Sequence, residues 1–457
     1  MGRIIIHGRA QIYCWRPTAR GGIFFRMRRH LHLLLFLLCA HPLIAAAQLP
    51  VPLPLPLPPL GPIIEAPLRG TVGETTVRAA ARLRPLADQA RNLLRRHPAQ
   101  LESDPRGFPV TRAVIIALAP DPDALARALL RGYVIQDDRQ LAGLGQQLVT
   151  LLVPRGTSTR EALRELRAGD PQGQYDFDHL YIESAAALPA ATASPGASGI
   201  TPVEIRVGLV DGGVDAGHPV FQRRPPLVSG CDGRAQPSAH GTGVASLFVG
   251  WSDEFTGAAP GAQLLAVDVY CGSQAPGGRV RDVVAALGEL AAASVRVINM
   301  SIVGPDNAVL AATVRAVQAR DILIVAASGN DGPHAGPLYP AAYPGVVAVS
   351  AVDAKRRVLP EASGGRHVSF AAPGADLRAA APQGGYQQVR GTSYAAPLVA
   401  GLLARELARP GASSVDVLRQ FAAVADDLGA RGRDNRYGYG LVGEEPPGRG
   451  LMARPSR

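Results

Sequence analysis

The sequence predicts an α/β protein built on a doubly wound parallel sheet with helices on both faces. Residues 203–442 alternate short apolar runs with longer helical stretches, for example 280–293 and 307–319. The runs EIRVGLV, QLLAVDV, RVINMS and DILIVAA are largely apolar, as expected of strands that are buried on both faces. Because strands that alternate with helices form parallel sheets, we expect ligands to bind just beyond the carboxyl ends of these strands.

A smaller α+β domain is predicted for residues 113–183. Its pattern runs strand, helix, strand, strand, helix, strand, from AVIIALA at the start to YDFDHLYIE at the end. The first helix ends at Gly132, and the second begins with a capping box, Ser158 to Glu161. This order of elements is typical of an open-faced α/β sandwich of the ferredoxin-like kind.

The amino terminus predicts export. From Met27 the chain reads MRRHLHLLLFLLCAHPLIAAAQ, which joins two arginines, a short apolar core and a cleavage site of small residues. This is the pattern of a secretory signal peptide, so we assign residues 1–47 to a leader whose true start is Met27. An N-terminal anchor is the alternative, but the apolar run is too short for a membrane span. We therefore expect a periplasmic or secreted protein without stable membrane insertion.

Three further segments connect or follow these parts. Residues 48–112 hold a Pro-rich linker, VPLPLPLPPLGP, which favours a semi-rigid polyproline II spacer, and then a basic helical stretch interrupted by Pro85. Residues 184–202 are mostly small residues with proline and glycine, which predicts an exposed linker open to proteolysis. Residues 443–457 are predicted to form a disordered tail.

The net charge of +10 does not indicate nucleic-acid binding. Seven arginines lie in the first 30 residues, which contain no Asp or Glu, and Lys355 is the only lysine of the chain. Outside the leader no long basic run occurs, and no strip of aromatic and basic residues that could stack bases. We therefore expect no nucleic-acid partner.

Two of the four cysteines remain once the leader is removed, Cys231 and Cys271. An even pair in an exported protein predicts a disulfide. Closing a loop of roughly 40 residues would stabilise the fold by about 4 kcal/mol in the chain-entropy account. Two free, buried thiols are the alternative.

Four polar residues stand at strand or helix ends of the large predicted sheet. Asp211 ends the strand EIRVGLV, Asn330 follows DILIVAA, His240 precedes a helical stretch, and Ser393 opens the helix in GTSYAAPLVAGLLA. Each also has an ordinary structural explanation. Asp211 could accept backbone hydrogen bonds, and Asn330 could form a turn. His240 could simply pack in the core, and Ser393 could cap its helix. Their occurrence together at the ends of one parallel sheet favours a catalytic site instead.

With these residues the chain resembles the subtilisin-like (subtilase) serine protease family. The matching blocks are VGLVDGGVDAGHP, HGTGVAS, NMSIVGP, AASGNDG, YPAAYPGVVAVSAVD and GTSYAAPLVAG, in the order Asp, His, Ser, and they cover 203–442. Residues 113–183 also look like the ferredoxin-like inhibitory propeptide that precedes many such enzymes. The resemblance implies a zymogen in which 48–112 contains a pro-segment and 184–202 the processing site.

The resemblance implies a catalytic triad of Asp211, His240 and Ser393. A serine hydroxyl needs a neighbouring base, and an imidazole with an ordinary pKa of about 6.5 can take its proton and return it to the leaving amine. Asp211 would hold the other ring N–H and stabilise the imidazolium. The side-chain amide of Asn330 and the backbone N–H of Ser393, at a helix N-terminus, would form the oxyanion hole.

The segment NMSIVGP is expected to offer a strand edge to which a peptide substrate adds as an extra strand. The residues expected to line the cleft are Ser301, Ile302, Val303, Gly304, Ala327, Ser328 and Gly329. The chain departs from the family at Gly212, where Ser or Thr is usual, and at Tyr394, where Met is commonest. Ile302 and Val303 replace the commoner Leu-Gly, so side-chain specificity is not carried over.

The resulting hypothesis is a secreted serine endopeptidase that acts through an acyl-enzyme on Ser393 and is made as an autoprocessed zymogen. Two alternatives stay open: a catalytically impaired pseudoprotease that binds peptides, and an esterase or peptide ligase with the same triad. The partners are protein or peptide substrates and the chain's own propeptide. The chemistry needs no cofactor or metal, and structural calcium, common in the family, has no ligand cluster specific enough to locate.

Overall fold

The computed structural model describes residues 85–183, 186–188, 202–272 and 277–443. All of them belong to one compact unit, residues 57–457. The predicted leader and Pro-rich linker, most of the predicted linker at 184–202, and the tail beyond Gly443 lie outside the described residues.

A parallel sheet forms the centre of the described residues 202–443, in the order β15-β14-β13-β11-β7-β9-β8. Every neighbouring pair is parallel, which confirms the predicted fold class. The strands are β7 (Arg206–Asp211), β8 (Leu227–Gly230), β9 (Gln263–Asp268), β11 (Val297–Met300), β13 (Leu323–Ala327), β14 (Val347–Val352) and β15 (Val368–Pro373).

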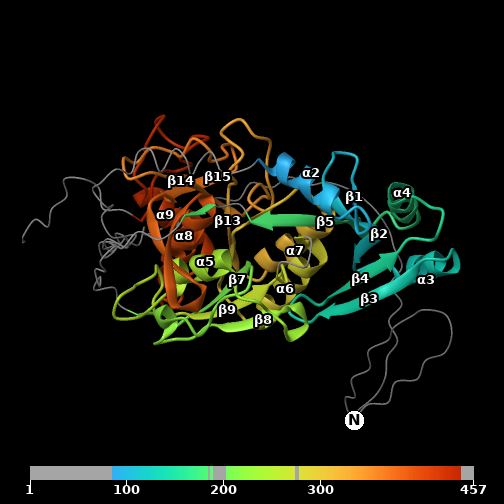
Figure 1. Cartoon of the computed structure of the whole chain (residues 1–457), viewed down its shortest axis with the longest axis horizontal. Helices are drawn as coiled ribbons and strands as arrows, with labels where there is room; N and C mark the ends of the chain where they lie inside the picture. Colours follow the sequence, from blue (N-terminus) through green and yellow to red (C-terminus); the bar gives the residue numbers. More distant parts are fainter. Residues whose placement is uncertain (1–84, 184–185, 189–201, 273–276, 444–457) are drawn as a thin grey trace, which may run out of the picture. The chain divides into compact units, whose positions relative to one another are not determined.

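Helices cover both faces of this sheet (Figure 1). The helices of one face are α5 (Ala239–Val249), α8 (Thr392–Leu407) and α9 (Ser414–Val424), and those of the other are α6 (Val280–Ala292) and α7 (Ala308–Gln318). In β13, Val325 packs with the first group, whereas its neighbour Ile324 packs with the second. Because successive side chains of a strand point to opposite faces, both must be apolar, which is why the strand sequences are apolar throughout their length.

Residues 101–183 form an antiparallel sheet with two helices; the elements from Pro109 onward follow the order predicted for 113–183, and one short strand that was not predicted precedes them. The elements are β1 (Leu101–Ser103), β2 (Pro109–Leu118), α3 (Pro122–Leu130), β3 (Val134–Leu141), β4 (Gln146–Leu152), α4 (Thr159–Gly169) and β5 (Gln174–Glu183). The predicted cap is present, since the hydroxyl of Ser158 accepts a hydrogen bond from the N–H of Glu161 at 3.2 Å. Helix α2 (Leu86–Arg96) precedes this sheet and begins directly after Pro85.

Strand β5 connects the antiparallel sheet to the rest of the chain. It pairs with β2 inside the sheet, and its last residues pair antiparallel with β10 (Gly278–Arg279) and β12 (Ile302–Val303). Figure 1 shows the green β5 extending from the blue-green strands toward the elements of residues 277–443. The expected strand edge at NMSIVGP is therefore occupied by the chain itself.

A short strand that follows β5 lies within residues 184–202, where we expected an exposed linker. Ala186–Leu188 form β6, which pairs antiparallel with β17 (Gly385–Arg390), and β17 pairs in turn with β16 (Leu377–Ala381). The small uncharged residues of this segment do not predict a strand, because the strand pairing uses backbone groups that every sequence has.

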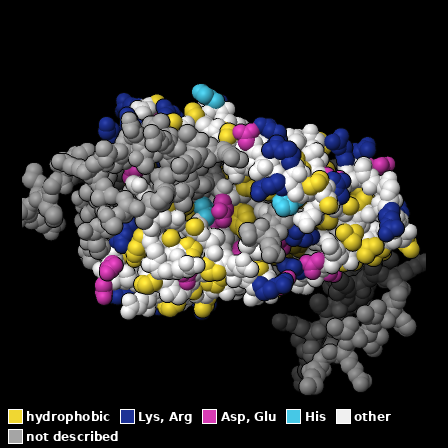
Figure 2. All heavy atoms as spheres, in the orientation of Figure 1, with side chains coloured by type: hydrophobic (Ala, Val, Ile, Leu, Met, Phe, Trp, Pro, Cys, Tyr) yellow, Lys and Arg dark blue, Asp and Glu magenta, His cyan; other side chains and the backbone are white. Residues whose placement is uncertain are grey.

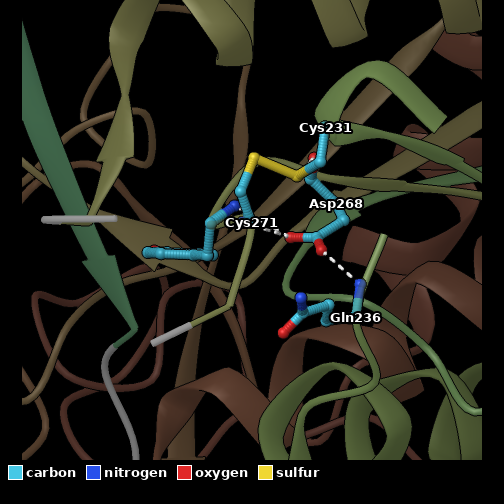
Figure 3. Close-up of a disulfide and its surroundings, with 5 residues drawn as sticks. Cys231, Gln236, Asp268 and Cys271 are labelled. Carbon is cyan, nitrogen blue, oxygen red and sulfur yellow. Dashed lines mark hydrogen bonds between the residues drawn. A yellow bond between two sulfur atoms is a disulfide. The ribbon is translucent and has the colours of Figure 1, made fainter. Parts of the chain in front are cut away.

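The predicted disulfide between Cys231 and Cys271 is present, with the sulfur atoms 2.10 Å apart. Figure 3 shows the carboxylate of Asp268, the last residue of β9, between this disulfide and the loop of Gln236. It accepts hydrogen bonds from the backbone N–H of Cys271 at 3.1 Å and of Gln236 at 3.0 Å. The loop that leads into α5 is thereby held against the end of β9.

Two surface features complete the fold. No helix within the described ranges combines the length and the apolar character that crossing a bilayer requires. On the face drawn in Figure 2, Lys and Arg side chains are interspersed with acidic and apolar ones. The basic side chains that are drawn on this face therefore lie among side chains of other types.

Candidate active site

Asp211 and His240 are in direct contact. Asp211 is the last residue of β7, and His240 lies in the first turn of α5. Nδ1 of His240 and Oδ1 of Asp211 are 2.7 Å apart, and the two side chains are 6% and 0% exposed. Because a carboxylate can only accept, Nδ1 donates the proton, which places the other ring nitrogen, Nε2, on the far side of the imidazole.

Small residues bring α5 close enough to β7 for this contact. The hydroxyl of Ser238 caps α5 by accepting from the N–H of Gly241 at 2.8 Å, while the N–H of Ser238 donates to the carbonyl of Gly213 at 2.8 Å. A Cβ added at Gly241 would lie 2.2 Å from the carbonyl oxygen of Gly212. Only glycine therefore lets the helix that carries His240 approach the end of β7 this closely.

A third titratable side chain, Glu183, lies beside this pair. It is the last residue of β5, and ligand atoms of Glu183, Asp211 and His240 all lie within 4.8 Å of one another. A Cβ added at Gly212 would lie 3.1 Å from Oε1 of Glu183 and 2.4 Å from Oγ of Ser238. The departure from the family at Gly212 therefore makes room for a carboxylate that the sequence analysis missed.

The charges of this cluster oppose the effect of burial on His240. Burial lowers the pKa of His240, but the charges of Asp211 and Glu183 and the hydrogen bond to Asp211 outweigh it and raise this pKa to about 9. Burial also raises the pKa of Glu183, which the charge of His240 opposes. With Glu183 in place, the charged form of the imidazole is therefore favoured more than it would be by Asp211 alone.

Glu183, Asp211 and His240 are also the one group of side chains in the described ranges whose ligand atoms lie close enough together to bind a metal ion. The 2.7 Å contact between Asp211 and His240 is a hydrogen bond, so both atoms share a proton instead of facing a cation. We therefore assign no metal to the group.

Ser393 lies in the first turn of α8, next to the predicted cleft residue Ser301. The turn begins at Gly391, whose φ of 132° is in the left-handed region that favours glycine. The hydroxyl of Ser393 donates to the carbonyl of Ser301 at 3.3 Å, and the hydroxyl of Ser301 donates to the carbonyl of Ser393 at 2.8 Å. The amide of Asn299, which the sequence analysis missed, donates to the Ser301 hydroxyl at 2.9 Å and so orients it.

The imidazole of His240 packs against the beginning of α8. The ring of Tyr394, the neighbour of Ser393, lies 5.4 Å from the ring of His240, centroid to centroid. Nε2 of His240 has no hydrogen-bond partner in the part of the chain that the structure describes. The expected bond between the Ser393 hydroxyl and Nε2 is thus not formed here, because the hydroxyl donates to Ser301.

Asn330 follows β13, and Thr392 orients its amide. Oδ1 of Asn330 accepts from the N–H of Thr392 at 3.1 Å and from its hydroxyl at 3.3 Å. The hydroxyl of Thr392 also accepts from the N–H of Gly329 at 3.2 Å. Since Oδ1 faces Thr392, Nδ2 lies on the opposite side of the amide. Of the other predicted cleft residues, Ala327 ends β13, and Ser328, the next residue, is buried.

A segment of the chain pairs with two strands close to Ser393. Ile302 of β12, the neighbour of Ser301, pairs with Glu183. Arg390 of β17, three residues before Ser393, pairs with Ala186. Glu183 and Ala186 are therefore each paired with a strand that adjoins a contact or a neighbour of the candidate nucleophile.

Comparisons with known proteins agree with this arrangement. The model of the subtilase family matches residues 203–440. Subtilisin E of Bacillus subtilis (strain 168) is 29% identical over 302 residues, which cover 63% of this chain and 78% of its own. Subtilisin DY of Bacillus licheniformis is 32% identical over 258 residues, covering 54% and 92%.

A solved structure adds the fold. Fervidolysin from Fervidobacterium pennivorans, a keratinolytic enzyme related to subtilisin, superposes with a TM-score of 0.63 at 20% identity, over 73% of this chain and 60% of its own. At that identity the likeness concerns the fold. Because the family match spans more than half of the chain, and its blocks contain the contact between Asp211 and His240, this chain belongs to the subtilase family of serine proteases.

Proposed function

We propose that this protein is a secreted serine endopeptidase, made as a zymogen, with Asp211, His240 and Ser393 as its catalytic triad. The observation that carries the proposal is the 2.7 Å bond between Asp211 and His240 beside the first turn of α8. An imidazole fixed in this way presents Nε2 as the atom that can accept a proton, and the candidate nucleophile is on the adjacent helix.

The proposed reaction begins when the Ser393 hydroxyl turns from the carbonyl of Ser301 to Nε2 of His240. His240 takes the proton as Oγ attacks the substrate carbonyl, and then returns it to the leaving amine as the C–N bond breaks. Water repeats the two steps on the acyl-enzyme and releases the acid. Throughout, Asp211 fixes the tautomer of the imidazole and stabilises its charged form.

The developing oxyanion would be stabilised from two sides. Nδ2 of Asn330 is one donor, because Thr392 holds the opposite side of the amide. The backbone N–H of Ser393 is the other, at the beginning of α8, where the helix dipole favours negative charge. The bonds between Asn299, Ser301 and the backbone of Ser393 would keep this turn in place.

Residues before Glu183 act, in this proposal, as an inhibitory propeptide. Carboxylates of β5 contact two helix starts of the protease fold: Asp176 accepts from the N–H of Ala308 at 2.7 Å, and Asp178 from the N–H of Arg281 at 3.3 Å. Both sites favour negative charge. β5 also occupies the strand edge of β12, so it blocks the site where a substrate strand would add.

We further propose that the enzyme cuts its own chain between Glu183 and Ala186. Glu183 pairs with β12 beside Ser301, and Ala186 pairs with β17 three residues before Ser393, so the peptide bonds between them lie in the part of the chain closest to the candidate nucleophile along these two strands. Export is part of the same proposal, and the Cys231–Cys271 disulfide supports it because disulfides persist in oxidising compartments.

The test compares the purified wild-type protein with Ser393→Ala. We expect the wild type to mature with a new N-terminus at residue 184, 185 or 186, read by N-terminal sequencing, while Ser393→Ala keeps its full length. A matched control, Ser413→Ala, removes a hydroxyl that caps α9 and should still mature. Maturation of Ser393→Ala in isolation, or cleavage well beyond Ala186, would contradict the proposal.

A further inference from the structure

Tyr181 is a fully buried residue of the segment that lies in the cleft. It stands two residues before Glu183 on β5 and pairs with Gly278 of β10. Its side chain is fully buried, at 0% exposure, in the same hydrophobic cluster as Val280 and Ile302. The ring of Tyr181 therefore fills a space between β10 and β12, which we call the Tyr181 pocket.

Glycine at position 304 makes this pocket possible. A Cβ added to Gly304 would lie 2.7 Å from Cδ1 and 2.8 Å from Cε1 of Tyr181, so the ring lies directly against the glycine. Gly278, Gly304, Pro305 and Tyr343 all belong to residues 203–442, so the groups nearest the ring and its hydroxyl come from the protease fold.

The inner end of the pocket is polar. The hydroxyl of Tyr181 donates to the carbonyl of Pro305 at 2.6 Å. Among the described residues that carbonyl accepts from no second donor: the hydroxyl of Tyr343 lies beside that of Tyr181 but donates to the carbonyl of Asn307 at 2.9 Å. Burial raises the pKa of the Tyr181 hydroxyl well above its ordinary value, so the group remains a donor at any working pH.

We propose that this pocket is a tyrosine-selecting substrate subsite, in which the Pro305 carbonyl recognises the phenol hydroxyl of a substrate residue placed as Tyr181 is. The inference rests on the proposed function and names the substrates that the enzyme favours. In such a substrate, one residue pairs with Ile302 as Glu183 does, and a tyrosine stands two residues before it. An apolar pocket discriminates poorly between Phe and Tyr. A pocket with a buried acceptor rejects Phe, because Phe would leave the carbonyl without a partner.

The experiment uses the mature enzyme and fluorogenic peptides that copy residues 179–188, HLYIESAAAL. The tyrosine is kept, or replaced by phenylalanine, O-methyltyrosine or leucine. We expect kcat/KM to fall about tenfold or more from Tyr to Phe, the loss typical of an unpaired buried acceptor. O-methyltyrosine keeps the ring but cannot donate a hydrogen bond, so kcat/KM for its peptide should fall at least as far.

Variants of the enzyme test the pocket itself. Gly304→Ala should lower kcat/KM for the Tyr peptide about tenfold or more and bring the Tyr-to-Phe ratio close to one. Gly336→Ala is the matched control, since a Cβ there meets nothing within 4 Å, and it should leave the ratio unchanged.

Equal rates for the Tyr and Phe peptides, from an enzyme that degrades casein, would overturn the subsite and leave the protease assignment intact. If the ratio of kcat/KM between the Tyr and Phe peptides is unchanged in Gly304→Ala, the proposed subsite is overturned as well. If neither casein nor any peptide is cleaved, the proposed function fails, and the subsite fails with it.

Discussion

Replacing Glu183 by glutamine in the zymogen should lower the pKa of His240. The Glu183 carboxylate faces His240 together with that of Asp211, with ligand atoms within 4.8 Å. Burial lowers the pKa of His240, and the two negative charges reverse this and raise it to about 9. Glu183→Gln keeps the size of the side chain and removes one of the two charges, so the protonated imidazole loses part of its stabilisation.

The size of the effect follows from the distance. Two unit charges no more than 4.8 Å apart attract by at least about 3 kcal/mol at an effective dielectric constant of about 20. Since one pH unit corresponds to about 1.36 kcal/mol, a fully charged Glu183 accounts for about 2 units. Burial raises the pKa of Glu183 and so weakens its charge, and we expect the pKa of His240 to fall by about 1 to 2 units.

The assay is an NMR titration of the His240 ring in the Ser393→Ala zymogen, which stays intact, with and without Glu183→Gln. Glu204→Gln is the matched control, because the Glu204 side chain is 83% exposed and should leave the pKa unchanged. With Ser393 present, the lower pKa leaves more neutral imidazole at pH 7, so maturation should begin at a lower pH than in the wild type. An unchanged or higher pKa of His240 in Glu183→Gln would refute this electrostatic account.

The remaining predictions concern the oxyanion, the approach of α5 and the disulfide. Asn330→Ala should lower kcat by about 10²–10³, the size known for subtilisin when one oxyanion donor is lost, with little change in KM; steady-state kinetics showing unaltered turnover would remove Asn330 from the site. Gly241→Ala should lower kcat/KM about 10²-fold. A Cβ 2.2 Å from the Gly212 carbonyl oxygen would displace the helix that carries His240 by up to about an ångström. Near-normal kinetics would show that α5 tolerates the methyl group. Replacing Cys231 and Cys271 together by serine should destabilise the Ser393→Ala zymogen by up to about 4 kcal/mol in urea, given a separation of 40 residues, and an unchanged midpoint would contradict the loop-closure account.

The sequence was most informative where burial dictates the pattern. Strands buried on both faces must be apolar, so the runs that end at Asp211 and before Asn330 could be located, and with them the edge of the sheet. The capping box at Ser158 was found in the same way, because its hydrogen bond is local.

Contacts between distant segments could not be predicted in this way. Glu183 reaches His240 only because β5 pairs with β10 and β12, and no pattern around Glu183 reveals those partners. Ala186–Leu188 have the composition of a linker, yet their backbone groups pair with β17. Asn299 also went unnoticed, since its role depends on Ser301. Such pairings depend on non-local contacts that composition does not record.

The orientation of the Ser393 hydroxyl was a further limit. The expected bond to His240 is replaced by one to the carbonyl of Ser301, an acceptor within reach of the same side chain. A rotamer chosen between two nearby acceptors is set by the local geometry and by what occupies the cleft, and a sequence motif specifies neither.

Labelling of the mature protein with a fluorophosphonate tests the central claim most directly, namely that Asp211, His240 and Ser393 act as one site. Mass spectrometry of the digested protein is expected to find the label on Ser393, and His240→Ala, prepared in its cleaved form, is expected to lose it. Labelling of another residue, or undiminished labelling of Ser393 in His240→Ala, would contradict the account.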